Sequence, residues 1–394
     1  MNYKISIIIP VFNVENYIRN ALNSILRQTI GFEHLEVIMV DDNSTDKSGD
    51  IIDEYAAKYD NFTAIHLPEN SGAAGKPRNV GMEKITSDYL MFLDPDDYYT
   101  DNACEVLYNK IIKEDVDIVF GNYSNFRHET PLKVKKPLGS KNEIIVHKLH
   151  EESRLLDVAP TLWTKIFKSK FIKENSITFL EGIPGQDFVF VVHSFLEANG
   201  IVFLNNFIVC NRIIRTKGSN KSMTYTRGKK YCIGLIKSYS TVYDLFMKYN
   251  CEEYITPVFR PHIYFWMKQF VASNLDSSES KEVLIIAAPL FRKLNSKGIE
   301  FRPEWDVFFN CILNKKYSES IVLTEVIRAF LKRERKLQAN NKKLKNSNNS
   351  FKKKFNQKKK QVAILQTLNG WINYKSKNIW NRTKKRIKTS LKRG

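Results

Sequence analysis

The chain has 394 residues, of which 43% are apolar and 12% aromatic. At roughly 150 residues per domain this is enough for at least two domains with a sizeable hydrophobic core. Its five cysteines are scattered and form no Cys-x-x-Cys pair, which argues against a disulfide framework or a structural zinc site.

The formal net charge of +20 is concentrated at one end of the chain. Residues 331–394 hold 22 of the 62 Lys and Arg residues and one of the 42 acids, Glu334, so the rest of the chain is close to neutral. Such asymmetry is typical of a tail that binds a polyanion or an anionic surface. No apolar run of about 20 residues is present, and the first apolar run is too short for a signal peptide. We therefore expect a cytoplasmic protein without a membrane span.

Strand and helix patterns alternate over the first 125 residues. Apolar, β-branched runs predict strands at 4–13, 35–46, 62–67 and 88–97, and helical spacing predicts helices at 14–29, 47–59 and 76–85. Continuous apolar strands between helices predict an α/β fold, a mostly parallel sheet covered on both faces. Ligands of such sheets bind beyond the carboxyl ends of the strands. Two acidic clusters lie at those ends, Asp41–Asp42 and Asp94–Asp97.

The pattern changes twice further along the chain. Residues 162–172 and 188–199 are expected to be helical and residues 200–214 to form a strand, whereas aromatic-rich helical patterns dominate residues 229–330. We therefore predict three parts: an α/β domain over 1–226, an α-helical domain over 227–330 and a basic tail over 331–394.

Apolar residues recur in the basic tail at helical intervals. One set is spaced by seven, which is half of a coiled-coil seam and is equally consistent with a solvated, low-complexity linker. A second set can share helical faces among Lys and Arg, as in a helix that lies on an anionic membrane surface. The alternatives are a disordered tail or a grip on another polyanion; nucleic acid is disfavoured because the body is neutral. The first set is Leu323, Phe330, Leu337, Leu344 and Phe351, and the second is Ile364, Leu365, Leu368, Trp371, Ile372, Trp380, Ile387 and Leu391.

The segment FLDPDD places Asp94 and Asp96 two residues apart at the end of a predicted strand. Mg²⁺ and Mn²⁺ prefer hard oxygen ligands and are commonly held by one or two carboxylates together with substrate phosphates. The fixed φ of Pro95 helps to keep such a turn in one shape. Taken alone, however, an Asp-x-Asp pattern is more often a solvated turn.

Several other motifs accompany this one in a fixed order. IIIPVFN, VDDNSTD, NSGAAGKPRNVG and FLDPDD are followed by LWTKIFKSKFI and EGIPGQDFVFVVHSFLEANG, each at a predicted strand end or helix start. Together they resemble the family 2 inverting glycosyltransferases of the GT-A fold over about residues 3–225. Within that family the pattern is most similar to bacterial transferases of teichoic acid and other cell-envelope polysaccharides.

The resemblance implies a site for a UDP-sugar donor. Asp42 matches the acid that accepts the uracil N–H, Asp96 the metal ligand, and Asp94 a group on the ribose or the metal's water shell. The metal would be Mn²⁺ or Mg²⁺. Helix capping is the alternative for Asp41 and Asp42, and an exposed charge is the alternative for Arg78. The implied donor-binding set is Pro10, Phe12, Asp42, Asn70, Arg78, Asp94, Arg215, Ser219 and Ser222.

Asp187 matches the catalytic base of the family, with Gln186 where a Glu is usual. A carboxylate within reach of an acceptor hydroxyl suits that role. The alternative is an acid that stabilises a helix N-terminus after Gly185.

The implied function is transfer of a hexose or N-acetylglucosamine from a UDP-sugar, with inversion, to a cell-envelope polymer or lipid-linked acceptor. The implied location is the inner face of the cell membrane, with homo-oligomerisation through the tail. Two alternatives remain open. One is a nonenzymatic scaffold of envelope assembly built on a degenerate transferase body, and the other is a nucleotidyltransferase.

Overall fold

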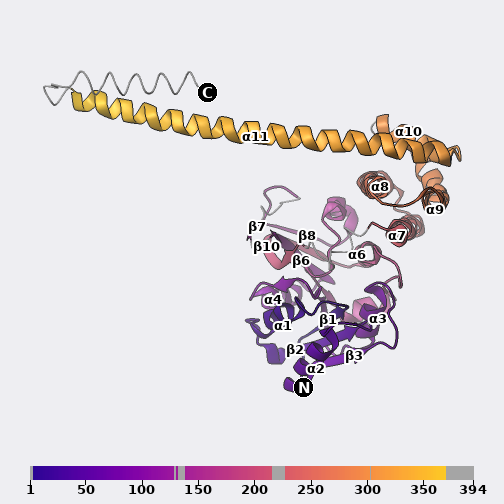
Figure 1. Cartoon of the computed structure of the whole chain (residues 1–394). Helices are drawn as coiled ribbons and strands as arrows, with labels where there is room; N and C mark the ends of the chain where they lie inside the picture. The colour runs from indigo at the N-terminus through magenta and orange to yellow at the C-terminus, as the bar shows by residue number, and fades with distance from the viewer. Residues whose placement is uncertain (1–2, 128–129, 132–137, 215–226, 302, 370–394) are drawn as a thin grey trace. The chain divides into compact units, whose positions relative to one another are not determined.

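The computed structural model describes residues 3–127, 130–131, 138–214, 227–301 and 303–369 (Figure 1). The chain divides into two compact units, Met1–Thr324 and Glu325–Gly394.

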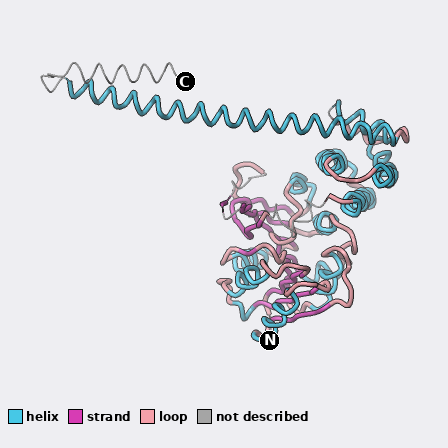
Figure 2. Tube along the Cα trace, in the orientation of Figure 1, coloured by secondary structure: helices cyan, strands magenta, loops and turns pink. Residues whose placement is uncertain are grey.

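The first unit is built on a mixed sheet surrounded by helices (Figure 2). Strand β7 (Thr130–Pro131) extends it beside β6, and β8 (Glu143–Val146) extends it beside β10. The main order of the sheet is β3 (Phe62–His66), β2 (Leu35–Asp41), β1 (Ile5–Val11), β4 (Tyr89–Phe92), β9 (Lys165–Lys168), β6 (Ile118–Arg127), β10 (Ile201–Ile213) and β5 (Tyr98–Tyr99).

The four strands predicted in the first 100 residues form the parallel part of the sheet. Strand β1 pairs in parallel with both β2 and β4, so Ile8 lies opposite Ile38 on one side and Phe92 on the other. Every residue of β1 and β2 is buried. This explains the continuous apolar runs, because both faces of these strands are covered by helices.

Alternate residues of β1 face different layers of helices, as the two-residue period of a strand requires. Ile5, Ile7 and Ile9 pack in a core with side chains of α1 (Ile18–Leu26), α2 (Ser48–Lys58) and α4 (Ala103–Glu114). Ile8 faces Gly81 of α3 (Gly75–Lys84) on the other side of the sheet. Two 3₁₀ segments complete this region: Phe32–His34 lies between α1 and β2, and Leu149–Asp157 between β8 and β9.

The expectation of a helix over residues 162–172 was wrong for its first half. Residues Lys165–Lys168 form β9, which runs antiparallel between β4 and β6, and helix α5 begins only at Ser169 and ends at Glu174. Ile166 and Phe167 are both fully buried. A short apolar segment of this kind does not reveal by its periodicity whether it is strand or helix, and here tertiary pairing decides.

Helices dominate the rest of the first unit. They pack around buried aromatic side chains such as Trp266, whose Nε1 donates a hydrogen bond to the carbonyl oxygen of Cys232 at 2.9 Å. Helix α7 (Lys229–Lys248) also contacts the loop before α6 (Gln186–Glu197), because Ser238 Oγ donates to the carbonyl oxygen of Pro184 at 3.1 Å. The elements are α6 (Gln186–Glu197), α7 (Lys229–Lys248), a 3₁₀ turn (Glu252–Tyr254), α8 (Ile255–Val271), α9 (Ser277–Asn295) and α10 (Pro303–Leu313).

Helix α11 (Tyr317–Asn369) begins in the first unit and makes up the described part of the second. Phe330, Leu337 and Leu344 of the seven-residue repeat are all more than half exposed on it. Whether this stripe forms a coiled coil stays a prediction, and Trp371, Trp380 and the rest of the tail from residue 370 lie outside the described residues. None of the helices in the described part of the chain is long and apolar enough to cross a membrane.

Candidate active site

A cavity of about 1010 Å³ opens at the carboxyl ends of β1, β2 and β4. It brings together eight of the residues that the sequence suggested: Pro10, Phe12, Asp42, Asn70, Arg78, Asp94, Asp96 and Asp187. The other three, Arg215, Ser219 and Ser222, lie outside the described residues.

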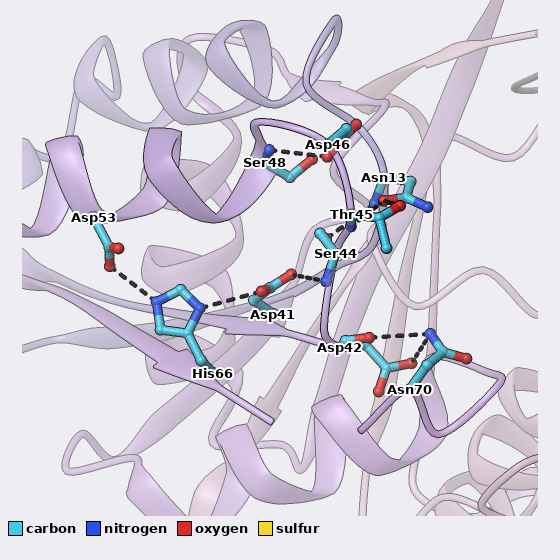
Figure 3. Close-up of polar contacts among 10 residues, drawn as sticks. All are labelled: Asn13, Asp41, Asp42, Ser44, Thr45, Asp46, Ser48, Asp53, His66 and Asn70. Carbon is cyan, nitrogen blue, oxygen red and sulfur yellow. Dashed lines mark hydrogen bonds and ion pairs between the residues drawn. The ribbon is translucent and has the colours of Figure 1, made fainter. Parts of the chain in front are cut away.

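Asp42 follows β2 and is held at the cavity by the loop that begins at Asn70 (Figure 3). Asn70 Nδ2 donates to Asp42 Oδ2 at 3.1 Å, while the N–H and Oγ of Ser71 donate to Oδ1 at 2.8 Å and Oδ2 at 3.0 Å. Burial raises the pKa of Asp42, and the hydrogen bonds from Ser71 work against that rise. Ser71, which the sequence argument overlooked, therefore positions the carboxylate that Asn70 also contacts.

The neighbouring acid, Asp41, points to a different cluster (Figure 3). Its Oδ2 lies 3.1 Å from Nδ1 of His66, whose Nε2 lies 3.0 Å from Oδ1 of Asp53. The contact with Asp53, together with that from Asp41, raises the pKa of His66. The two adjacent acids thus have separate surroundings, and of the two only Asp42 lines the cavity.

Helix capping, the alternative considered for Asp41 and Asp42, is not their role in α2, whose N-cap residue is Lys47 and has no side-chain cap. Helix α2 begins at Ser48, and Asp46 Oδ1 accepts a hydrogen bond from the N–H of Ser48 at 2.9 Å. Asp41 instead accepts from the N–H of Ser44 at 3.1 Å and so stabilises the turn before the helix.

Arg78 is buried, with only 3% of its side chain exposed, and it bridges two carboxylates. Its Nη2 donates to Asp94 Oδ1 at 2.7 Å and its Nη1 to Asp187 Oδ1 at 2.5 Å. Burial alone would lower the pKa of Arg78, but the charges of Asp187 and Asp94 outweigh burial and raise it. The alternative of an exposed charge at a helix start was therefore wrong.

Asp94, Asp96 and Asp97 form a compact cluster around the turn at Pro95. Their carboxylate oxygens all lie within 4.8 Å of one another. Asp97 is buried and accepts a hydrogen bond from the N–H of Ile213 at 2.9 Å, and burial raises its pKa well above the usual range. Asp97 thus fastens the turn to β10. All three acids line the cavity, but only Asp94 and Asp96 are partly exposed.

Asp187 lies in the first turn of α6, behind a residue with left-handed backbone. Gly185 has φ +89°, a conformation that favours glycine, and a Cβ there would lie 3.0 Å from Ser238 Oγ. Burial raises the pKa of Asp187, and the charge of Arg78 opposes that effect. Gln186 takes part as well, because in the amide orientation that satisfies its neighbours its oxygen accepts from Arg78 Nη1 at 3.3 Å.

Lys165, which the sequence argument did not single out, is a fully buried lysine near this site. Its Nζ donates to the carbonyl oxygen of Thr161 at 2.6 Å and lies 4.7 Å from the ring centroid of Phe120. Burial lowers its pKa to about 7, although Asp187 acts in the opposite direction. The signal that could have revealed Lys165 is the presence of a lysine in a short apolar segment of the sequence.

The far wall of the cavity is aromatic and comes from helices well beyond the acidic motifs. Phe188 of α6 contributes, and α7 and α8 add Tyr231, Leu235, Tyr239, Pro261, His262 and Phe265. Sequence analysis assigned the residues of α7 and α8 to a separate α-helical domain and named none of them as site residues, because their periodicity resembles that of any buried helix.

Comparison with known proteins found similarity to one family over part of the chain. The model of the family described as "Glycosyl transferase family 2" matches residues 6–171. A poly(ribitol-phosphate) beta-glucosyltransferase of Bacillus spizizenii is 35% identical over 200 residues, which are 50% of this chain and 30% of that protein. The poly(ribitol-phosphate) beta-N-acetylglucosaminyltransferase TarS of Staphylococcus aureus is 30% identical over 206 residues, 52% of this chain and 34% of TarS.

A solved structure covers more of the chain. The crystal structure of S. aureus TarS 1–349 in complex with UDP-GlcNAc superposes with a TM-score of 0.66 and 21% identity, covering 83% of this chain and 92% of that one. This likeness confirms the expected GT-A-like α/β fold followed by helices. The chain nevertheless spans only about a third of the length of the two curated relatives named above.

Proposed function

Because residues 6–171 form a glycosyl transferase family 2 domain, we propose that this protein is an inverting glycosyltransferase that uses a UDP-sugar. The observation that carries the proposal is the bridge made by Arg78, which joins Asp94 of the acidic cluster to Asp187 within one cavity. The group that positions the leaving diphosphate and the base that takes the proton of the attacking hydroxyl act at the same anomeric carbon. They must therefore lie close together in one cavity.

In the proposed reaction Asp187 is the general base. An acceptor hydroxyl loses its proton to the Asp187 carboxylate as its oxygen forms a bond to the anomeric carbon, and the bond from that carbon to the diphosphate oxygen breaks. UDP leaves with the bonding electron pair, and the configuration inverts because attack comes from the opposite side. The charge of Arg78 opposes the rise that burial causes in the pKa of Asp187 and so favours the ionised carboxylate that a base requires.

Asp42, Asn70, Pro10 and Phe12 are proposed to hold the nucleoside, and Asp94 and Asp96 to hold Mn²⁺ or Mg²⁺. The acidic cluster fits such an ion, because its donors are all carboxylate oxygens and Asp94 and Asp96 are partly exposed. When bound, the ion would supply positive charge to the diphosphate of the leaving group.

The acceptor is proposed to be a cell-envelope polymer of the teichoic-acid type. The names of the two curated relatives support this, since both act on poly(ribitol phosphate), one with a glucosyl and one with an N-acetylglucosaminyl group. A capsular polysaccharide or a lipid-linked acceptor would fit the same chemistry.

We also propose the division of labour that the composition suggested, with residues 1–226 catalytic, 227–330 helical and 331–394 a basic tail. The tail would hold the protein on the anionic inner face of the membrane, either as a single chain or as a homo-oligomer. Membrane binding by the tail is supported by α11, on which the exposed side chains of Leu337 and Leu344 lie among many lysines.

The test is UDP release by the full chain from UDP-glucose or UDP-GlcNAc, with Mn²⁺ and poly(ribitol phosphate). Asp187→Asn should lower the rate by about 10²- to 10⁴-fold. Asp244→Asn should leave the rate unchanged, because Asp244 is an exposed acid of α7 that pairs with Lys293. A parent protein that turns over no UDP-sugar, and that Asp187→Asn leaves unchanged, would favour the nonenzymatic scaffold. Release of diphosphate in place of UDP would indicate a nucleotidyltransferase.

A further inference from the structure

The cavity has two chemically different walls. One carries the ionisable side chains of Asp42, Arg78, Asp94, Asp96, Asp97, Asp187 and Arg212. The wall contributed by α7 and α8, which we call the aromatic wall, carries no charged side chain and consists of Tyr231, Leu235, Tyr239, Pro261, His262 and Phe265.

The size of the cavity leaves room for a second ligand. Pockets for one drug-sized molecule typically measure about 300–1,000 Å³. At about 1010 Å³ this cavity lies at the upper limit of that range. The charged wall is suited to the nucleotide and diphosphate, so the aromatic wall is available to another molecule.

His262 is held in one orientation at the aromatic wall. Its Nδ1 lies 2.7 Å from the carbonyl oxygen of Val258, an acceptor that requires the proton to be on Nδ1. Its ring stacks on Phe188 with centroids 4.2 Å apart and planes at 16°, and Tyr239 meets it edge-on at 5.6 Å. Burial lowers the pKa of His262, so the ring is neutral near pH 7.

This arrangement leaves Nε2 of His262 as a hydrogen-bond acceptor. Within the described part of the chain no group donates to Nε2. Phe188, the ring on which His262 stacks, follows Asp187 directly in α6. The acceptor atom is therefore fixed relative to the proposed base through one aromatic contact.

Phe265 supplies an apolar surface beside this acceptor. Its side chain is 38% exposed although it lines the cavity, and it lies three residues after His262 on α8. Residues three apart on a helix are neighbours on one face. An exposed aromatic ring next to a lone-pair acceptor is suited to a molecule that has C–H faces and hydroxyl donors.

We propose that the aromatic wall is the acceptor subsite and that it binds a neutral, polyhydroxylated unit, a sugar ring or a polyol chain, of the polymer. A hydroxyl of that unit donates to His262 Nε2, and its C–H groups pack on Phe265. The absence of charged side chains in the wall favours the hydroxylated part of the polymer over its phosphates. This inference rests on the proposed transferase function and identifies where its second substrate lies.

The test uses the full chain and three measurements: the KM for poly(ribitol phosphate) in transfer, direct binding of poly(ribitol phosphate), and the melting-temperature shift caused by UDP. Phe265→Ala and His262→Phe should each raise the KM and weaken polymer binding by about tenfold, which corresponds to about 1.4 kcal/mol, because each removes a direct contact with the polymer. His262→Gln keeps an acceptor atom and should lose less than His262→Phe. The melting shift caused by UDP should remain that of the parent protein.

Ile285→Ala is the matched control, since Ile285 is also an exposed apolar residue of the helical region and lies outside the cavity. All variants keep the basic tail, so a difference in polymer binding reports on the wall. Polymer binding equal to the parent in Phe265→Ala and His262→Phe would overturn the inference. Loss of the UDP shift together with polymer binding would also overturn it, since the wall would then support the whole site. Absence of sugar transfer by the parent would overturn the proposed function alone, because polymer binding is measured separately.

Discussion

Arg78 Nη1 and Asp187 Oδ1 lie 2.5 Å apart although 109 residues separate them in the chain. Arg78 lies on α3, which packs against one face of the parallel half of the sheet, and Asp187 lies in the first turn of α6. Because Arg78 also contacts Asp94, one buried guanidinium links the three segments that the proposed reaction requires. The planar fork of arginine can span two carboxylates, which the single ammonium of lysine does less well.

Arg78→Ala should therefore destabilise the fold as well as the site. It would leave Asp94 and Asp187, whose side chains are 28% and 39% exposed, without their shared partner, a change that costs about 1–3 kcal/mol. Urea unfolding measures the loss. Arg19→Ala, which removes an exposed pair with Glu54, should change the stability far less. Equal stability of the two variants would contradict a structural role for the Arg78 bridge.

Asp96→Ala should abolish stabilisation by Mn²⁺ in the presence of UDP. Ligand binding to the folded state raises the melting temperature by mass action, so loss of a metal ligand removes the shift. Asp53→Ala removes an acid that contacts His66 away from the cavity and should keep the shift. Retention of the full Mn²⁺ shift in Asp96→Ala would exclude Asp96 as a ligand.

Lys165 should make stability depend on pH above neutrality. Its pKa is about 7 in the folded protein and 10.5 ordinarily, so between these values the unfolded chain holds a proton that the folded protein has released. The free energy of unfolding then rises with pH, by at most about 1.4 kcal/mol per unit, and the full cost of burying the ammonium applies below pH 7.

Lys165→Met is the variant that isolates this effect. The difference in unfolding free energy between the parent and Lys165→Met should move in favour of the parent from pH 7 to pH 9. Denaturant titrations at several pH values measure it. Parallel pH profiles for the two proteins would show that Lys165 keeps its ordinary pKa after folding.

Gly75→Ala should weaken the contact between α3 and the segment before α6. A Cβ at Gly75 would run into the carbonyl oxygen of Leu180, which is backbone and cannot rotate away. Overpacking of this kind costs about 1–3 kcal/mol, more than alanine gains over glycine in a helix. Gly228→Ala is the control, because nothing lies within 4 Å of a Cβ there. Both variants are compared by thermal unfolding, and a stable Gly75→Ala protein would show that this segment can move.

Much of the fold could be predicted because its signals are local. The runs that became β1 and β2 are mostly apolar, interrupted only by Ser6 and Glu36 before Asp41 ends β2, and this pattern favours strands buried on both faces. The shared location of the acids after β2 and β4 could be predicted in the same way, because parallel strands have their carboxyl ends at one edge of the sheet. Strand β9 escaped prediction because Lys165–Lys168 is too short to show a period, and its pairing with β4 and β6 is a property of distant segments.

The sequence by itself determined which chemical groups are available: the acids after two strands, an acid opening a helix behind Gly185, and a basic tail. Only the tertiary structure decided how they are paired. Asp41 contacts His66, whereas Asp42 is bound by Ser71. Asp97 accepts a hydrogen bond from the backbone of Ile213, and Arg78 is buried between Asp94 and Asp187. The tertiary structure also turned His262 and Phe265, which read as ordinary helix residues, into a wall of the same cavity. The physical reason is that charge pairing and burial depend on distances in space, and residues over 100 positions apart share no local pattern that encodes them.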